Sequence, residues 1–345
     1  MSNKKMLLAL GLLVVVAALL TACAGPQGEP GPQGPAGPAG PAGPAGPAGA
    51  PGESFTIESL TCTQCHDNTT LITGKKAAWQ DSIHATGEAF LRGTSAGCAG
   101  CHSGGGFKAM IAAGQRPDQV EAGDPNPTHQ DCRTCHQIHT SYTSEDWALT
   151  TNAAVPLYAF EGVTFDGGNG NLCANCHQPR SAFSLTDGLV DVTSVHWGPH
   201  HGPQSAMLLG IGGAGAVEGK PSAHATMVEN TCVTCHVGEN DDHSFQPNVA
   251  SCVACHADAE NFDINGAQTE VDAMLVELRD LLVAKGLLAG DETEGFHPVV
   301  GKYAEAEGTA LWNYIFVAVE DSSHGAHNMA YTKALLEASI AALQP

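Results

Sequence analysis

The sequence is poor in the side chains that usually build a protein's surface and core. Only 14% of its 345 residues are charged and 6% are aromatic, whereas a typical globular domain has about 25% charged residues. Basic residues are the scarcest, with 14 Lys and Arg against 36 Asp and Glu and a formal net charge of −22. Phosphates bind to positive surfaces, so this charge argues against a nucleic-acid partner. The chain has instead 13 cysteines and 17 histidines, and we expect something other than packed side chains to fill its interior.

The N-terminal segment has the anatomy of an export signal. Two lysines precede an apolar stretch over residues 6–20, which is shorter than the about 20 residues of a membrane-spanning helix, and no other long apolar run follows. The next residues, LTAC ending at Cys23, resemble the lipobox of bacterial lipoproteins. This resemblance implies that residues 1–22 are a signal peptide, that Cys23 carries lipid, and that the exported protein lies at the outer membrane or cell surface, facing the periplasm or the outside. The alternative is an ordinary secretory peptide that leaves Cys23 as a free thiol.

A glycine repeat follows the lipobox. Glycine recurs at every third position from Gly25 to Gly52, and proline and alanine fill most positions between. A collagen triple helix requires this pattern, because only glycine fits next to its axis. Residues 23–53 are therefore predicted to be a lipidated cysteine and a collagen-like spacer. Two interpretations stay open: a stalk that joins three chains into a homotrimer, or a single polyproline II tether that holds the rest of the protein off the membrane.

Six copies of the pattern Cys-x-x-Cys-His lie within residues 54–261, and every cysteine after Cys23 belongs to one of them. This pattern is the attachment signature of c-type haem. Two cysteines three positions apart lie on one helical turn and can each form a thioether with the porphyrin, and the adjacent histidine becomes an iron ligand. The predicted thioether residues are Cys62, Cys65, Cys98, Cys101, Cys132, Cys135, Cys173, Cys176, Cys232, Cys235, Cys252 and Cys255. The predicted proximal iron ligands are His66, His102, His136, His177, His236 and His256.

Zinc sites and disulfides are the alternatives for so many cysteines. Zinc ribbons also use Cys-x-x-Cys pairs, but zinc does not require histidine directly after the second cysteine. Since 17 of 345 residues are histidine, six accidental histidines in six motifs would have a probability on the order of 10⁻⁸. Disulfides suit an exported protein but leave these histidines unexplained. We therefore predict six haem c groups, whose porphyrins take the place of an aromatic core.

Each haem iron has a second axial position, and the chain has more histidines outside the motifs than six irons need. The candidate distal ligands are His84, His129, His139, His196, His200, His201, His224, His243 and His327. Two of these choices have alternatives, because His129 competes with His139 and His324 competes with His327. The segment VHWGPHH is expected to supply at least one ligand. Methionine is less favoured, and Met207 is its candidate.

The motif array resembles the multihaem cytochromes c of bacterial respiration. The segment SHGAHN, from Ser323 to Asn328, resembles the C-terminal turn of the nitrite reductase and hydroxylamine oxidoreductase group. That resemblance implies that His327 is a distal haem ligand. The ammonia-forming nitrite reductases carry Cys-x-x-Cys-Lys at their catalytic haem, and this sequence has no such motif. The departure argues against an open, substrate-binding iron.

The predicted fold is mainly α with little regular secondary structure. After the collagen-like stalk we expect a haem-packed multihaem cytochrome c domain over residues 54–261 and a C-terminal helical region over residues 262–345 that contributes a distal histidine. Apolar residues at helical spacing predict three helices there, around residues 271–282, 311–318 and 335–343. These helices are expected to cap the haem domain or to form a dimer or filament contact. The run GIGGAG matches a dinucleotide glycine pattern but lacks a strand and helix around it, so no nucleotide site is predicted.

Electron transfer is the favoured function, because the supply of histidines exceeds the demand of six irons. Electrons would pass through bis-histidine haems between other redox proteins or to an extracellular acceptor, and the acidic chain would suit a basic partner. The alternative is an enzyme, a multihaem reductase or oxidase of a small nitrogen or sulfur compound with one haem lacking its sixth ligand. A conducting polymer of subunits is the third interpretation, and the lipid anchor argues against it.

Overall fold

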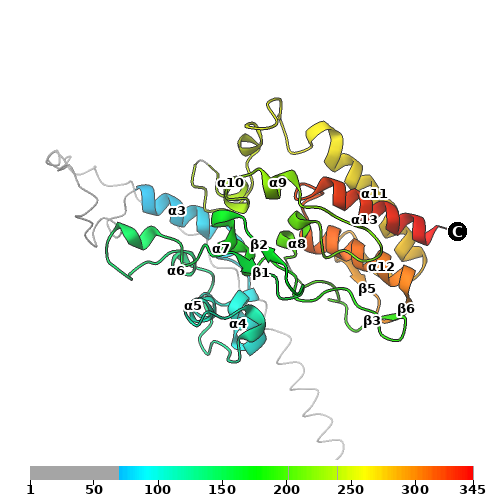
Figure 1. Cartoon of the computed structure of the whole chain (residues 1–345), viewed down its shortest axis with the longest axis horizontal. Coiled ribbons are helices and arrows are strands. Elements are labelled where there is room, and N and C mark those ends of the chain that lie inside the picture. Colours follow the sequence, from blue (N-terminus) through cyan, green and yellow to red (C-terminus); the bar gives the residue numbers. More distant parts are fainter. Residues whose placement is uncertain (1–69, 201, 239, 345) are drawn as a thin grey trace, which may run out of the picture. The chain divides into compact units, whose positions relative to one another are not determined.

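The computed structural model describes residues 70–200, 202–238 and 240–344 (Figure 1). The predicted signal peptide, the lipidated Cys23, the collagen-like spacer and the first motif, with Cys62, Cys65 and His66, lie outside the described residues, as does His201. The described chain is mainly helical with little sheet, which confirms the predicted fold class at this level.

Most of the helices are short. The α-helices are α3 (Thr70–Gln80), α4 (Ala96–His102), α5 (Gly104–Ala112), α6 (Cys132–Cys135), α7 (Asn171–Ala174), α8 (Gln204–Leu209), α9 (Ala223–Thr226), α10 (Cys232–His236), α11 (Ala267–Ala284), α12 (Glu305–Tyr314) and α13 (Met329–Leu343). The 3-10 helices are η2 (Ala89–Thr94), η3 (Pro117–Gln119), η4 (Ser144–Trp147), η5 (Gly168–Gly170), η6 (Val249–Cys252) and η7 (Ile264–Gly266), and η8 (Ile315–Asp321) is a π-helix. Isolated helices below about 12 residues are marginal in water, so the short elements depend on what packs against them.

The strands form three two-stranded antiparallel pairs. They are β1 (Val155–Pro156), β2 (Thr164–Phe165), β3 (Leu189–Val192), β4 (Leu288–Asp291), β5 (Gly295–Pro298) and β6 (Gly301–Ala304). Strand β1 pairs with β2 and β4 with β5, so both are local hairpins. Strand β3 pairs with β6, with Leu189 opposite Ala304 and Val192 opposite Gly301. This third pair ties the middle of the chain to its C-terminal part.

The main apolar core lies among α11, α12 and α13, which pack against one another (Figure 1). The three predicted C-terminal helices are confirmed, and the expected apolar stripe of α11 is buried at Val271, Leu278 and Leu282. Gly286 follows α11 with φ of +71°, a left-handed conformation that glycine adopts without strain and that commonly ends a helix. The second predicted helix continues past Tyr314 as the π-helix η8.

This core also includes residues from the predicted haem domain. Val190, Val192, Met207 and Ala214 are buried in the same cluster as the C-terminal helices. The packing therefore crosses the boundary predicted at residue 261, and the helices share a core with the middle of the chain. Met207, the methionine candidate for an iron, is fully buried there, and its sulfur accepts a hydrogen bond from the Thr332 hydroxyl at 3.6 Å.

The glycine run at residues 210–215 has a structural role in this core. Trp312 Nε1 donates to the carbonyl of Gly212 at 2.8 Å, and the amide N–H of Ala214 donates to Asn313 Oδ1 at 2.7 Å. A Cβ at Gly213 would lie 2.4 Å from a methyl group of Leu335. The run is thus a place where the backbone approaches the helices α12 and α13 closely.

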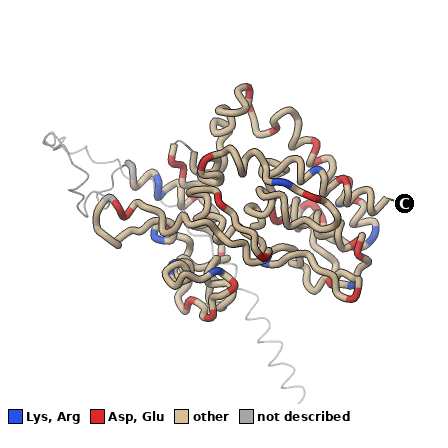
Figure 2. The backbone as a smooth tube through the Cα atoms, viewed as in Figure 1, with Lys and Arg blue, Asp and Glu red and all other residues tan. Residues whose placement is uncertain are grey.

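Acidic side chains are distributed along the described chain, and basic ones are few (Figure 2). Within the described ranges, no helix combines the length and the apolar character needed to cross a membrane.

Candidate haem-binding sites

The five described motifs lie in short helical turns. Helix α4 contains Cys98, Cys101 and His102, and α10 runs from Cys232 to His236. In the other three motifs the histidine N–H donates to the carbonyl of the first cysteine, which closes one helical turn. These bonds measure 2.9 Å from His136 to Cys132, 2.9 Å from His177 to Cys173 and 2.8 Å from His256 to Cys252. The backbone thus places both thiols and the imidazole of each motif close together, as haem attachment requires.

Each of the five described motif histidines faces a second imidazole. The ring centroids are 6.2 Å apart for His177 and His84, 6.4 Å for His102 and His200, 6.3 Å for His136 and His243, 6.4 Å for His236 and His327, and 6.3 Å for His256 and His224. Metal–imidazole bonds measure about 2 Å and the centroid of the ring lies roughly 1 Å behind its nitrogen, so two imidazoles on opposite sides of one iron have centroids about 6 Å apart. The five spacings fit one haem iron between each pair.

These pairs join distant parts of the sequence. In the sequence, His224 and His243 stand out because each closely precedes a Cys-x-x-Cys motif. In the structure His224 instead faces His256, and His243 faces His136. The turn after α3 carries His84 to His177. Spacing along the sequence therefore does not identify the partner.

Hydrogen bonds at Nδ1 orient many of these rings. Six of the ten paired histidines have an acceptor at this atom, so that Nε2 is left for a metal. The acceptors are the carbonyl of Trp147 for His136 (2.7 Å), Gln204 Oε1 for His177 (3.1 Å), the carbonyls of Ala326 for His224 (2.6 Å), Phe245 for His236 (2.9 Å) and Asp241 for His243 (2.7 Å), and Asp321 Oδ1 for His327 (2.7 Å). Gln204 and Asp321 have no recognisable signal in the sequence, although Asp321 lies only six residues before His327.

Burial favours the neutral form of several of these imidazoles. Burial, and secondarily the nearby His177, lowers the pKa of His84 to about 4. Burial also lowers the pKa of His136, of His177 and of His236 below the usual histidine value. At His327 burial acts in the same direction, but the Asp321 carboxylate outweighs it and the pKa is raised. Metals bind the neutral imidazole, so burial prepares most of these side chains for ligation.

Cysteines of neighbouring motifs approach one another. The thiols of Cys101 and Cys176 are close enough to interact electrostatically, and so are those of Cys173 and Cys232. Cys101 Sγ lies 3.9 Å from the carbonyl of Asn175, inside the neighbouring motif. In a loaded protein these sulfur atoms would be thioethers at porphyrin edges. The motif at residues 173–177 therefore lies between the motifs at 98–102 and 232–236.

Three other predicted distal candidates have different aromatic neighbours among the described residues. His129 packs on Phe90 with centroids 4.2 Å apart, and His139 stacks on Tyr142 at 5.6 Å. His196 faces His297 at 6.1 Å, and neither residue belongs to a motif. His297 is absent from the predicted candidates because nothing in its sequence context distinguishes it.

Within the described residues the cysteines form no metal cluster and no disulfide. There, no three of the His, Cys, Asp and Glu side chains converge as a metal site would need. The ten described cysteines are free thiols: Cys98, Cys101, Cys132, Cys135, Cys173, Cys176, Cys232, Cys235, Cys252 and Cys255.

Comparison with known proteins gives a fold but no family. No protein-family model matches the chain, and no curated protein matches it significantly. The structure is similar to the crystal structure of the outer cell wall cytochrome OcwA, with a TM-score of 0.52 and 22% sequence identity over 78% of this chain. The match covers 50% of OcwA, so this chain spans about half the length of that cytochrome. The similarity shows that the chain shares the fold of this cytochrome over most of its length.

Proposed function

We propose that this protein transfers electrons through six covalently bound c-type haems at the cell envelope. One observation carries the proposal: each of the five described motif histidines faces a second imidazole at a centroid distance between 6.2 and 6.4 Å. Such pairs fill both axial positions of an iron, so the metal can accept and release one electron but has no free face for a substrate.

The residues would have two roles, haem attachment and iron ligation. The two cysteines of each motif would hold the porphyrin through thioethers, and His102, His136, His177, His236 and His256 would be proximal ligands. Opposite them, in the same order, the distal ligands would be His200, His243, His84, His327 and His224. The haem supplies the one-electron chemistry when bound, and the chain fixes the ring orientations and excludes water from the buried imidazoles.

Contact between motifs supports transfer along the chain of sites. The neighbouring pairs Cys101–Cys176 and Cys173–Cys232 would bring the thioether-bearing edges of neighbouring porphyrins together. Electron tunnelling falls steeply with edge-to-edge distance, so adjacent edges make a continuous path. The haem at residues 173–177 would relay electrons between the haems at residues 98–102 and 232–236.

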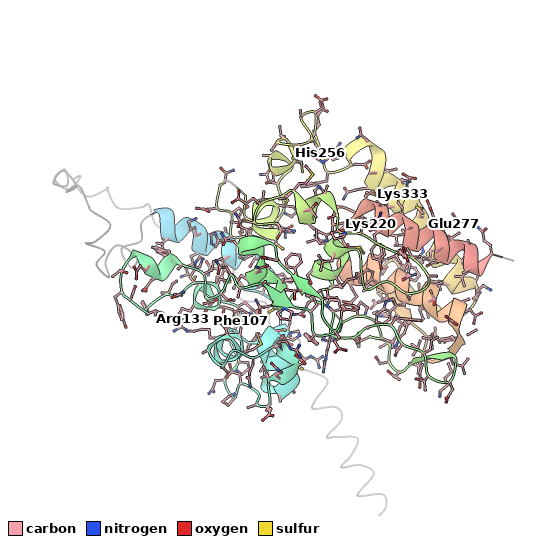
Figure 3. All side chains as sticks on the ribbon, viewed as in Figure 1. Phe107, Arg133, Lys220, His256, Glu277 and Lys333 are labelled. Carbon is pink, nitrogen blue, oxygen red and sulfur yellow. The ribbon has the colours of Figure 1, made fainter. Side chains whose placement is uncertain are left out.

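The haem at the sixth motif would be the site at which electrons leave the protein. Cys255 and His256 are exposed, and His256 lies in the segment between α10 and α11 (Figure 3). Val253 and Phe262 expose 44% and 42% of their surface close by in sequence. An exposed haem edge with an apolar rim suits brief contact with another redox protein or an extracellular acceptor.

The envelope location rests on the sequence and on the similar fold. The lipobox-like segment ending at Cys23 would give a lipid anchor, and the fold is similar to that of an outer cell wall cytochrome. The glycine repeat would hold the haem region off the membrane, with or without trimerisation. Mass spectrometry of the N-terminal peptide tests the anchor, and light scattering of the lipid-free protein tests the trimer, which a monomer at micromolar concentration would exclude.

The haem proposal is tested on the purified full-length protein. A pyridine haemochrome assay should return six haems per chain, and the EPR spectrum of the oxidised protein should be low-spin at the five described sites. Far fewer than six equivalents would overturn the haem assignment. A high-spin ferric signal that persists in the intact protein would instead favour the enzyme alternative, with the open site at the first motif, Cys62–His66, if the five paired sites stay low-spin.

A further inference from the structure

The hydrogen bond of His327 differs in charge from those of the other paired histidines described above. Its Nδ1 lies 2.7 Å from the Asp321 Oδ1 carboxylate oxygen, whereas His136, His224, His236 and His243 donate to backbone carbonyls and His177 lies against an amide oxygen. A full negative charge next to Nδ1–H gives the imidazole more of the character of an imidazolate, and therefore makes it a stronger iron ligand.

The Asp321 side chain is fixed and shielded from water. Asp321 is 4% exposed and ends the π-helix η8. Its Oδ2 accepts hydrogen bonds from the hydroxyl and the backbone N–H of Ser323, the latter at 3.4 Å. The Gln204 amide donates to the carbonyl of Glu320 at 2.9 Å and to that of Asp321 at 3.4 Å. A buried, immobile carboxylate interacts more strongly with a nearby charge than a solvated one does.

We propose that Asp321 is a positioning residue that lowers the reduction potential of the haem held at Cys232, Cys235 and His236, through its hydrogen bond to the distal ligand His327. This inference rests on the proposed function. Ferric haem carries one more positive charge than ferrous haem, so a carboxylate behind the ligand stabilises the oxidised state more. The haem at this site is then the stronger reductant compared with the same haem without the carboxylate.

The test is a potentiometric titration of the loaded protein, followed by EPR. The His327→Ala variant first identifies the low-spin signal that belongs to this haem. In Asp321→Asn the same haem should become easier to reduce by at least tenfold in its equilibrium constant, which is about 59 mV for one electron. The other haems should keep their potentials.

Two further variants make the result specific. Asp272→Asn is the matched control, because the Asp272 carboxylate contacts His324, an exposed histidine that faces no motif histidine among the described residues; it should leave every potential unchanged. Ser323→Ala removes a donor from Asp321 Oδ2, leaves more charge on the carboxylate and should lower the potential. This milder change keeps the test decisive if Asp321→Asn fails to assemble.

The possible outcomes distinguish the role of Asp321 from the assignment of a haem to this site. If His327→Ala removes no low-spin signal, His327 is not a ligand and the assignment of this site fails. If the signal is removed but neither Asp321→Asn nor Ser323→Ala shifts the potential in the expected direction, the role of Asp321 is overturned while the haem assignment stands.

Discussion

The imidazole rings of His84 and His177 lie nearly perpendicular, with an interplanar angle of 88° and centroids 6.2 Å apart. The interplanar angles of the other four pairs fall into two groups. The angle is 78° for His224 and His256 and 68° for His102 and His200, but only 31° for His136 and His243 and 38° for His236 and His327. The chain therefore presents two kinds of imidazole pair, crossed and closer to parallel.

The ring angles predict two classes of low-spin EPR signal. Crossed imidazole planes leave two iron d orbitals close in energy, which gives a highly anisotropic signal, whereas parallel planes separate these orbitals and give a rhombic signal. We expect both classes in the oxidised protein. The His84→Met variant should remove an anisotropic signal, and the His243→Met variant should remove a rhombic one. A spectrum with a single class would contradict the pairing described here.

A second prediction distinguishes two histidines of one segment. His200 faces His102, whereas His196 faces His297. Replacing His200 with alanine should therefore open one iron and produce a high-spin ferric signal. The matched His196→Ala variant should stay low-spin at every described site. The measurement is EPR at equal haem content, and a high-spin signal from His196→Ala alone would show that the ligand had been assigned to the wrong residue.

A third prediction concerns the intermediate site. Cys173 and Cys176 contact cysteines of two other motifs, so losing this haem should break the path between them. The double variant Cys173→Ala/Cys176→Ala should return five haems and slow internal electron exchange at least tenfold in flash-reduction experiments. The control Cys252→Ala/Cys255→Ala also loses one haem but should leave exchange among the remaining sites fast. Equal slowing in both variants would argue against the intermediate position.

A fourth prediction uses two helical glycines in different surroundings. A Cβ at Gly308 in α12 would lie 2.3 Å from the Val190 Cβ of strand β3, so Gly308→Ala should destabilise the fold by about 1–3 kcal/mol through overpacking. Gly74 in α3 has nothing within 4 Å of its Cβ position. Gly74→Ala should therefore stabilise by roughly 0.5–1 kcal/mol, because alanine restricts the unfolded chain and favours helix. Urea unfolding measures both, and the opposite order would mean that β3 does not pack on α12.

A fifth prediction concerns the start of α11. The Asp263 carboxylate accepts hydrogen bonds from Thr269 Oγ1 at 2.6 Å and from the backbone N–H groups of Thr269 at 3.1 Å and Gln268 at 2.8 Å. These bonds, chiefly those from Thr269, lower the pKa of Asp263. A lowered folded-state pKa contributes stability above the unfolded value of about 3.9, and this contribution is lost as the pH falls through the folded value.

Asp263→Asn should therefore be less stable than the unaltered protein at pH 7, and the difference should shrink below about pH 4. The measurement is the urea midpoint at several pH values. A difference that stays constant down to pH 3 would show that the charge of Asp263 does not contribute. The Asp258→Asn variant, which changes an acid five residues earlier in the chain, serves as the comparison.

Features that depend on neighbouring or periodic residues could be predicted from the sequence, and side-chain contacts between distant segments could not. The helical turn of Cys132–His136 needs only adjacent residues, and the stripe from Val271 to Leu282 needs only the period of a helix, so both follow from spacing. The choice of His200 over His196 depends on which side chain reaches His102 across the fold. The neighbours His136 and His139 show the same limit, because nothing in their spacing predicts that His136 faces His243 while His139 stacks on Tyr142.

By itself the sequence determined the Cys-x-x-Cys-His motifs, the scarcity of basic residues and the three C-terminal helices, because each is encoded in composition or in neighbouring or periodic residues, and the export signal stays a prediction of the same kind. Only the tertiary structure decided which imidazoles face each other, at what angle, and that Asp321 stands behind His327. The imidazole pairs join segments far apart along the chain, and the Asp321–His327 contact, between residues six apart, depends on the conformation of the turn between η8 and α13. Neither kind of contact is encoded in adjacent or periodic residues.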